Sequence, residues 1–288
     1  MKKILLLFAT FSLALVSCRQ EIDPADPMST GDEVTVNIVP AIPDTFSLTK
    51  APGANANSGK GGITNIDWAS YDLRYILAIY KADGSALAKP VMKEFKNATN
   101  LDATFSLRLV PGNYKLVLWA DFVTAGDQAN DLHYSTADLK NVTMINGYAV
   151  NDESRDAYFA IKDLTVGDAS FNESITLKRP FGKVRVVTND IQDLNSGTVP
   201  TSVKITYPAG TIPNGINAVE GTLLSGTNGS AVSYTANVNT FYQQGHDAAA
   251  ANQTLFTDYI FGIPAGQSAI KFTIETYDQT SALIRSRN

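Results

Sequence analysis

FSLRLVPGNYKLVLW, residues 105–119, carries the strongest signal for the fold. Apolar side chains occupy alternate positions on both sides of a Pro-Gly-Asn turn at residues 111–113. A period of two is typical of a β-strand that buries one face. Proline presets one backbone angle of a turn, and glycine or asparagine accepts a positive φ. The stretch therefore predicts two antiparallel strands, 105–110 and 114–119, joined as a β-hairpin.

The same alternation recurs along most of the chain and predicts an all-β protein. Further strands are predicted at residues 34–39, 73–80, 157–165, 174–178, 184–187, 203–207, 231–238, 255–261 and 270–274. The one helical candidate is short, at about residues 247–253. Many short strands with turn signals between them indicate a β-sandwich or a barrel.

The strand pattern restarts near residue 180, which indicates two domains. Leu-Val-Pro-Gly at residues 109–112 precedes an alternating strand, and Ile-Pro-Ala-Gly at residues 263–266 precedes another. We interpret this as a degenerate repeat of one sandwich. The sequence therefore predicts tandem β-sandwich domains at residues 34–180 and 181–288.

The first eighteen residues have the pattern of a bacterial lipoprotein signal. Two lysines precede an apolar run at residues 4–16, which is shorter than the ~20 residues that a spanning helix needs. The run ends in Leu-Val-Ser-Cys at residues 15–18, which resembles the lipobox of bacterial lipoproteins. We expect residues 1–17 to be removed as a signal peptide and Cys18 to carry the lipid, rather than an ordinary signal with an incidental cysteine. Residues 18–33 would then form a lipidated tether.

Composition narrows the classes of function. The chain has 23 Lys and Arg against 28 Asp and Glu. Loss of residues 1–17 removes two lysines, so 21 basic and 28 acidic residues remain, a net charge of about −7. Nucleic-acid binding rests on neutralising phosphates, so we expect none from an acidic chain without a Lys/Arg cluster. Cys18 is the only cysteine, and no disulfide can form within the chain.

No recognisable catalytic motif is present in the sequence. The nucleophile elbow Gly-x-Ser-x-Gly and the glycine-rich phosphate-binding motifs are absent. His133 and His246 lie in polar, loop-like stretches, where we expect solvated side chains rather than bases or ligands. We therefore expect a protein that is not an enzyme and that holds no cofactor and no metal.

Loop carboxylates and aromatic residues offer weaker candidates. Acidic residues gather at residues 121–131 and 190–193, but neither spacing follows a calcium-binding loop, so we expect solvated side chains. Trp119 lies within a predicted strand and is expected in the core. The pair Phe241-Tyr242 is the more exposed candidate for contact with a glycan, the alternative being a pair that packs against the end of the sandwich.

Several stretches together resemble one family. Residues 155–159 read RDAYF, and residues 175–184 read ITLKRPFGKV. With VPGNYKL at residues 110–116, the lipobox and the tether, they resemble the fimbrillin-like lipoproteins, the subunits and relatives of type V pili. The resemblance implies two tandem transthyretin-like β-sandwiches. It also implies a precursor that is lipid-anchored at the outer membrane on the cell surface and that can enter a fimbrium.

The resemblance further implies how such a chain joins other pilus subunits. A trypsin-like protease cuts the precursor after a basic residue beyond the first strand, which removes the lipid and opens an apolar groove. A strand from another subunit then fills the groove by donor-strand insertion. Here the removable strand is Val34–Val39, and the basic residues that follow are Lys50 and Lys60. The family prefers arginine at the cut, so the alternative is that both lysines are ordinary loop charges.

The C-terminus departs from the family pattern. Family members often end in a further strand, whereas this sequence ends in LIRSRN, residues 283–288. Either that strand is absent, or the groove that it would occupy is filled from elsewhere.

Two functions from different classes follow from these observations. The leading hypothesis is a non-catalytic fimbrial subunit, or a pilus anchor or accessory subunit, that assembles by strand exchange. The alternative is a monomeric surface lipoprotein that binds a glycan or a host protein through its loops. A first strand paired inside the fold favours the pilus subunit, and exposed loop aromatics favour the binding protein.

Overall fold

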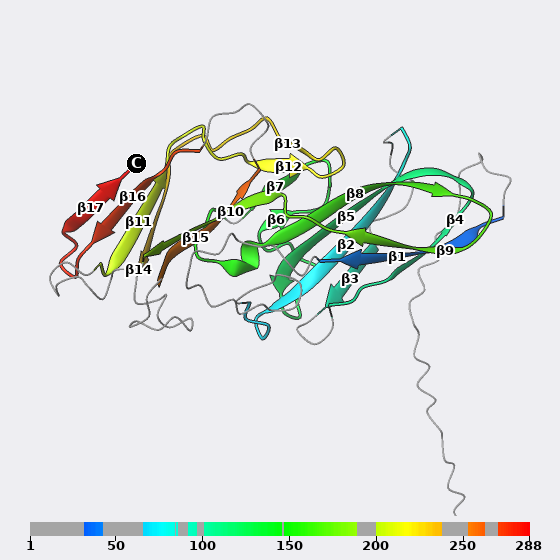
Figure 1. Ribbon diagram of the computed structural model, residues 1–288, viewed down its shortest axis with the longest axis horizontal. Coiled ribbons are helices and arrows are strands. Elements are labelled where there is room, and N and C mark those ends of the chain that lie inside the picture. Colours follow the sequence, from blue (N-terminus) through cyan, green and yellow to red (C-terminus); the bar gives the residue numbers. More distant parts are fainter. Residues whose placement is uncertain are drawn as a thin grey trace, which may run out of the picture.

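The described part of the chain is built almost wholly of β-strands in a computed structural model (Figure 1). It comprises residues 32–42, 66–83, 85, 92–96, 101–145, 147–188, 200–237, 253–262 and 270–288. These residues form 17 strands and one short 3₁₀-helix, η2 (Glu153–Arg155), so the predicted all-β sandwich fold is confirmed. None of the helical structure described is long and apolar enough to cross a membrane.

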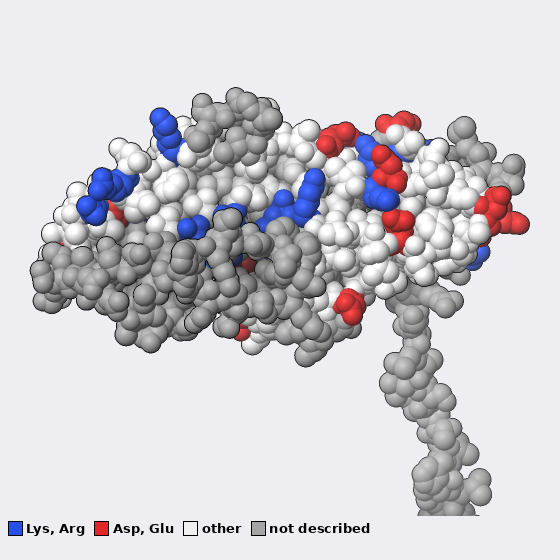
Figure 2. Space-filling model, in the orientation of Figure 1, with Lys and Arg blue, Asp and Glu red and all other residues white. Residues whose placement is uncertain are grey.

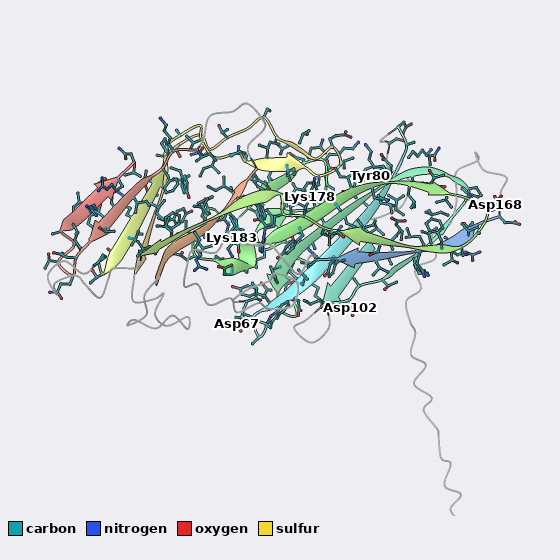
Figure 3. The ribbon with its side chains drawn as sticks, viewed as in Figure 1. Asp67, Tyr80, Asp102, Asp168, Lys178 and Lys183 are labelled. Carbon is teal, nitrogen blue, oxygen red and sulfur yellow. The ribbon has the colours of Figure 1, made fainter. Side chains whose placement is uncertain are left out.

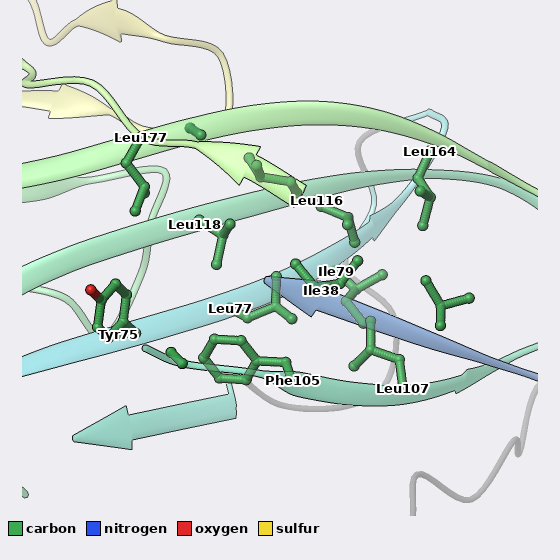
Figure 4. Packing of buried hydrophobic residues seen from close by; sticks show 14 of the residues in the cluster. Ile38, Tyr75, Leu77, Ile79, Phe105, Leu107, Leu116, Leu118, Leu164 and Leu177 are labelled. Carbon is green, nitrogen blue, oxygen red and sulfur yellow. The ribbon is translucent and has the colours of Figure 1, made fainter. Parts of the chain in front are cut away.

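The first sandwich consists of a three-stranded sheet facing a four-stranded sheet. The strand orders are β4-β1-β9 and β3-β2-β5-β8. The strands are β1 (Val34–Ala41), β2 (Tyr71–Lys81), β3 (Met92–Lys96), β4 (Phe105–Leu109), β5 (Gly112–Thr124), β8 (Ala157–Val166) and β9 (Phe171–Thr176). Apolar side chains from both sheets form one core cluster, with Ile38, Leu107 and Leu118 among its members (Figure 4).

β2 is buried on both faces. Leu73, Tyr75 and Leu77 belong to the core of the first sandwich, whereas Ile76 and Ala78 belong to a second apolar cluster. A strand that is covered on both faces becomes a nearly continuous apolar run. This explains why apolar residues lie on both faces of this strand.

A small sheet packs over the second cluster. Its strand order is β13-β12-β7-β6. The strands are β6 (Tyr134–Ser135), β7 (Val142–Met144), β12 (Gly215–Asn217) and β13 (Thr222–Leu223). The cluster combines Trp119 and Phe159 with Phe181, Ile216 and Phe261, so residues on both sides of position 180 share one core. The division into two domains at that position stays a prediction.

The second sandwich lies at the other end of the long axis (Figure 1). β10 (Phe181–Thr188) pairs with β15 (Gln253–Phe261), and a second sheet has the order β14-β11-β16-β17. Its strands are β11 (Ser202–Tyr207), β14 (Val232–Asn237), β16 (Thr273–Tyr277) and β17 (Leu283–Arg287). Val203, Ile205 and Tyr207 of β11 pack with Phe256 and Ile260 of β15.

The predicted hairpin around residues 111–113 is wrong in its pairing. Both strands exist, but β4 pairs with β1, whereas β5 pairs with β2 and β8. The turn therefore carries the chain from one sheet to the facing sheet. Burial gives the reason: Leu107 of β4 and Leu116 of β5 enter the same core from opposite layers. The matching stretch at residues 263–266 lies outside the described residues; the strands before and after it in the sequence, β15 and β16, belong to different sheets.

The last residues of the sequence, for which no strand was predicted, form β17, and whether this is the further strand of the family pattern stays open. β17 pairs antiparallel with β16 and forms the free edge of its sheet. All five of its residues are exposed, including Leu283 at 54% and Ile284 at 36%. An exposed edge strand presents unpaired backbone groups to other chains.

Candidate functional site

β1 lies in the middle of its sheet and pairs with a strand on each side. It runs antiparallel to β4, with Val36 opposite Leu107, and parallel to β9, with Val36 opposite Phe171. The side-chain amide of Asn37 donates to Asn172 Oδ1 at 2.8 Å. β1 therefore separates two strands that are not paired with each other.

One face of β1 completes the core of the first sandwich. Val36 and Ile38 have no exposed surface, and Val34 is 8% exposed. Figure 4 shows Ile38 and Ile79 in the space between the facing sheets. A fully buried aliphatic side chain contributes about 1.5–3 kcal/mol, so the three contribute roughly 5–9 kcal/mol together. That is comparable with the whole stability of an ordinary domain, about 5–15 kcal/mol.

A buried ionic network lies where the two sandwiches meet. Arg155 Nη1 donates to Asp258 Oδ1 at 2.9 Å, and both side chains are almost fully buried. Arg155 Nη2 also donates to the carbonyl oxygen of Tyr259 at 3.0 Å. The hydroxyls of Tyr148 and Tyr207 donate to Asp258 Oδ2. A buried charge is tolerated only when it is paired and hydrogen-bonded, and this network meets both conditions.

Two further ion pairs flank this network. Arg179 Nη2 lies 2.5 Å from Asp156 Oδ2, and Lys183 Nζ lies 2.6 Å from Glu153 Oε2. The hydroxyl of Tyr259 also donates to Glu153 at 2.5 Å. Three charged residues in and next to η2, Glu153, Arg155 and Asp156, thus each form an ion pair with a residue later in the chain. We call the three ion pairs the junction network.

Burial keeps the tyrosines of the junction network in their neutral form. It raises the pKa of Tyr148, Tyr207 and Tyr259 above the ordinary value. The neighbouring carboxylates raise these pKa values further, because a phenolate beside a carboxylate is repelled. Each phenol therefore keeps the proton that it donates to Asp258 or Glu153.

His133 is bonded within the protein, which corrects the expectation of a solvated side chain. Its Nε2 lies 2.7 Å from Ser154 Oγ and 3.6 Å from Asp152 Oδ2. Burial lowers the pKa of His133. Asp152 caps η2 by accepting the backbone N–H of Ser154. In the catalytic triad of a hydrolase, the hydroxyl bonds to one ring nitrogen of the histidine and the carboxylate to the other. Here the Ser154 hydroxyl and the Asp152 carboxylate both lie at Nε2 of His133, so the arrangement differs from a triad.

Two carboxylates at residues 121–131 are paired, which also corrects an expectation. Asp121 is fully buried and accepts from Arg74 Nε at 2.9 Å and Nη2 at 2.7 Å. Asp131 lies 2.8 Å from the same guanidinium and accepts the backbone N–H of Thr136 at 2.9 Å. Asp127 accepts from the neighbouring Asn130 side chain. Within the described ranges, no group of three or more His, Cys, Asp or Glu could hold a metal ion.

The residues on which processing depends lie outside the described residues. These are Cys18, Lys50 and Lys60. The same holds for His246, for the pair Phe241-Tyr242, for the acidic residues at 190–193 and for the helical candidate up to residue 252. Trp119 has no exposed surface, so its predicted place in the core is confirmed.

Sequence reasoning missed the junction network. RDAYF at residues 155–159 stood out only by its resemblance, without a role for Arg155 or Asp156. The sequence feature that could have indicated a buried ion pair is Asp258, which interrupts the apolar run at residues 255–261. A charged residue inside a buried strand needs a partner, but alternation does not say which one.

The fold and the inserted β1 strand define an elongated all-β sandwich protein with an ionic junction between its halves. The chain belongs to the family of unknown function DUF6562, whose model matches residues 28–288. No curated protein matches the chain.

Solved structures with a similar fold come from Bacteroides and Parabacteroides species, among others. A candidate adhesin from Bacteroides thetaiotaomicron is 11% identical with a TM-score of 0.47, over 90% of this chain and 81% of that chain. A candidate polysaccharide-binding protein from the same organism is 11% identical with a TM-score of 0.47, over 87% and 77%. A fimbrial assembly protein from Parabacteroides distasonis is 12% identical with a TM-score of 0.40, over 88% and 85%. At these values the function of the chain has to be argued from its own residues.

Proposed function

We propose that this chain is a non-catalytic cell-surface lipoprotein that serves as a fimbrial subunit, or as a pilus anchor or accessory subunit, and that joins its partners by strand exchange. The observation that carries the proposal is the position of β1. This first described strand is the central strand of a three-stranded sheet, and its buried face completes a core. Its removal would leave β4 and β9 with open edges on either side of an apolar groove.

Such a groove would favour assembly. Loss of β1 exposes the apolar surface that Val34, Val36 and Ile38 had covered, worth roughly 5–9 kcal/mol. A strand from another subunit can restore both the burial and the backbone hydrogen bonds. The intact precursor keeps its own strand in place, so the groove stays closed until the chain is cut.

The two ends of the molecule suit a head-to-tail arrangement. β1 lies in the sandwich at one end of the long axis, and the exposed edge strand β17 lies at the other end (Figure 1). A contact between unlike ends repeats from copy to copy and produces a filament if it does not close into a ring. This geometry supports a place for the chain within a linear assembly.

Lipidation at Cys18 and a cut after Lys50 or Lys60 complete the proposal. The lipid would hold the precursor at the outer membrane, because several acyl chains anchor a protein firmly. Both lysines follow β1 in the sequence, so a cut at either one separates β1 and the lipid from the rest of the chain.

The N-terminus of the protein recovered from the cell surface tests the proposal. Intact mass should give a start at Ala51 or Gly61 in assembled material. The double variant K50Q/K60Q should keep its first strand and remain outside the fibres, whereas K271Q is a matched control at an exposed lysine far from both positions in the sequence. A start at lipidated Cys18 in the assembled fibres would rule out a stalk subunit and leave an anchor or a monomeric binding lipoprotein.

A further inference from the structure

An apolar cavity of about 850 Å³ lies beside the junction network. Its walls come from both halves of the chain, with β8, β10, β12, β13 and β15 contributing. Its apolar lining includes the side chains of Phe159, Phe181, Ile216, Leu223, Phe261 and Phe272. Small-molecule sites commonly measure about 300–1,000 Å³ and have mainly apolar walls, so the cavity has the size and lining of such a site.

The charged groups at the edge of this cavity are basic. Lys178 and Arg179 line it, and no acidic residue does so in the described part of the chain. The Arg179 guanidinium is neutralised by Asp156 at 2.5 Å. The ammonium of Lys178 is exposed and lies 5.1 Å from the centroid of the Phe159 ring, with no carboxylate ion pair among the described residues. Among the described residues, Lys178 is therefore a positive charge beside the apolar walls that has no acidic partner.

Lys178 lies near the middle of the long axis, where the two halves meet (Figure 3). On the same side of the molecule, Lys and Arg side chains gather over the middle and the end that carries β17, whereas Asp and Glu lie mainly over the first sandwich (Figure 2). Among the described side chains on this face, Lys and Arg are the charges nearest to Lys178, which favours the approach of an anion over that of a cation.

We propose that the cavity binds a small amphipathic anion, with an apolar chain or ring system against the phenylalanine walls and a carboxylate beside Lys178. A sugar fits these walls poorly, because its hydroxyls would lose water without gaining hydrogen-bond partners. An amphipathic cation would bring a like charge to Lys178. This binding function goes beyond the fimbrial role and does not depend on strand exchange.

Calorimetric titration of the mature chain with monomeric dodecanoate tests the proposal. Each buried CH₂ contributes about fourfold in affinity, so dodecanoate should bind up to about 200-fold more tightly than octanoate. Dodecylammonium, which has the same chain and the opposite charge, should bind more weakly than dodecanoate.

Two variants separate the chain contacts from the charge contact. Leu223 is partly exposed on the wall, and L223D places a carboxylate there, so dodecanoate binding should be lost. K178Q should weaken binding about two- to fivefold, as expected for an exposed ion pair. R287Q removes an exposed positive charge from β17, far from the cavity, and should leave the affinity unchanged. The exposed position of Lys178 keeps this test valid even if L223D fails to fold.

Several results would overturn the proposal. They are the absence of saturable dodecanoate binding, equal affinity for dodecylammonium, and an affinity that K178Q does not change. A preference for maltoheptaose would make the cavity a glycan site. Co-sedimentation with vesicles of phosphatidylcholine and phosphatidylglycerol, without binding of free dodecanoate, would make it a membrane contact. Both of these outcomes contradict a site for a free amphipathic anion.

Discussion

Truncation of one side chain in β1 tests whether this strand supports the core as we have argued. Ile38 has no exposed surface and lies at the centre of the buried face of β1. Replacement of a buried isoleucine by alanine removes its burial and leaves a cavity, which costs about 2–5 kcal/mol. We expect I38A to fall within this range, because β4 and β9 hold the strand on both sides and limit the collapse of the cavity.

V39A is the matched control. Val39 is the next residue of the same strand, is also β-branched and is only partly buried on the opposite face. We expect V39A to lose less than about 1 kcal/mol, because little of its surface is withdrawn from water.

Urea unfolding followed by the fluorescence of Trp68 and Trp119 measures both variants. The free energy of unfolding should fall by at least about 2 kcal/mol more in I38A than in V39A, with the urea dependence unchanged. Equal losses, or a loss below about 1 kcal/mol in I38A, would show that β1 does not hold the core together. Removal of β1 would then not open an apolar groove that favours strand exchange.

Three further predictions concern the ionic networks and the choice of donor strand. Asp258→Asn leaves a buried arginine without its counter-charge and should lower the free energy of unfolding by about 3–5 kcal/mol, measured by thermal melting. Burial lowers the pKa of His133 below its ordinary 6.5, so the unfolded chain takes up the proton first as the pH falls. Stability should therefore decline as the pH falls below about 6.5, and H133Q should show a smaller decline in melts at pH 7.5 and pH 5.5. A protein trimmed of β1 should bind a peptide of residues 32–42 but not one of residues 281–288, because either face of the second peptide offers one large aliphatic side chain, Leu283 or Ile284, where β1 buries Val34, Val36 and Ile38; fluorescence polarisation of labelled peptides measures this.

Two control variants, D168N and H246Q, accompany these predictions. D168N removes an exposed carboxylate and should leave the melting temperature nearly unchanged, in contrast to Asp258→Asn. H246Q tests whether the pH dependence belongs to His133 alone. If H246Q reduced the pH dependence of stability as much as H133Q does, the assignment to His133 would be wrong. If D168N were as unstable as Asp258→Asn, the loss in Asp258→Asn would not come from the buried ion pair. Equal affinity of the trimmed protein for the two peptides would contradict the match between groove and strand.

We expect that changes in the junction network alter the stability of this chain without altering its strand exchange. The junction network lies between the two sandwiches, whereas β1 lies in the first sandwich at one end of the long axis. Changes at sites that share no partners usually add in their effects on stability. A variant of Asp258 should therefore weaken the link between the halves without changing which peptide fills the groove of β1.

The class of fold could be predicted from the sequence because alternation is a local property. β1, β4 and β5 each carry apolar residues at every second position, and the sequence predicts β1 and β4 close to their observed bounds, whereas β5 continues to Thr124. The pattern of a buried face depends only on neighbouring residues and on the period of the strand. The same reasoning placed Trp119 in the core, since a large aromatic residue within a strand is most often buried.

The partners of each strand depended on the tertiary structure. The pairing of β4 with β1, instead of β5, follows from two sheets that must cover one core, and no local pattern contains that information. The ion pair between Arg155 and Asp258 joins residues 103 positions apart, and its stability comes from burial that exists only after both sandwiches have formed. His133 likewise depends on the neighbouring η2 segment for its partner Ser154. The sequence by itself determined most of the longer strands, because side-chain period is local, but it did not indicate β3, β17 or the short strands β6, β7, β12 and β13. The tertiary structure decided which strands meet and which charges pair, because burial and long-range contact are properties of the whole fold.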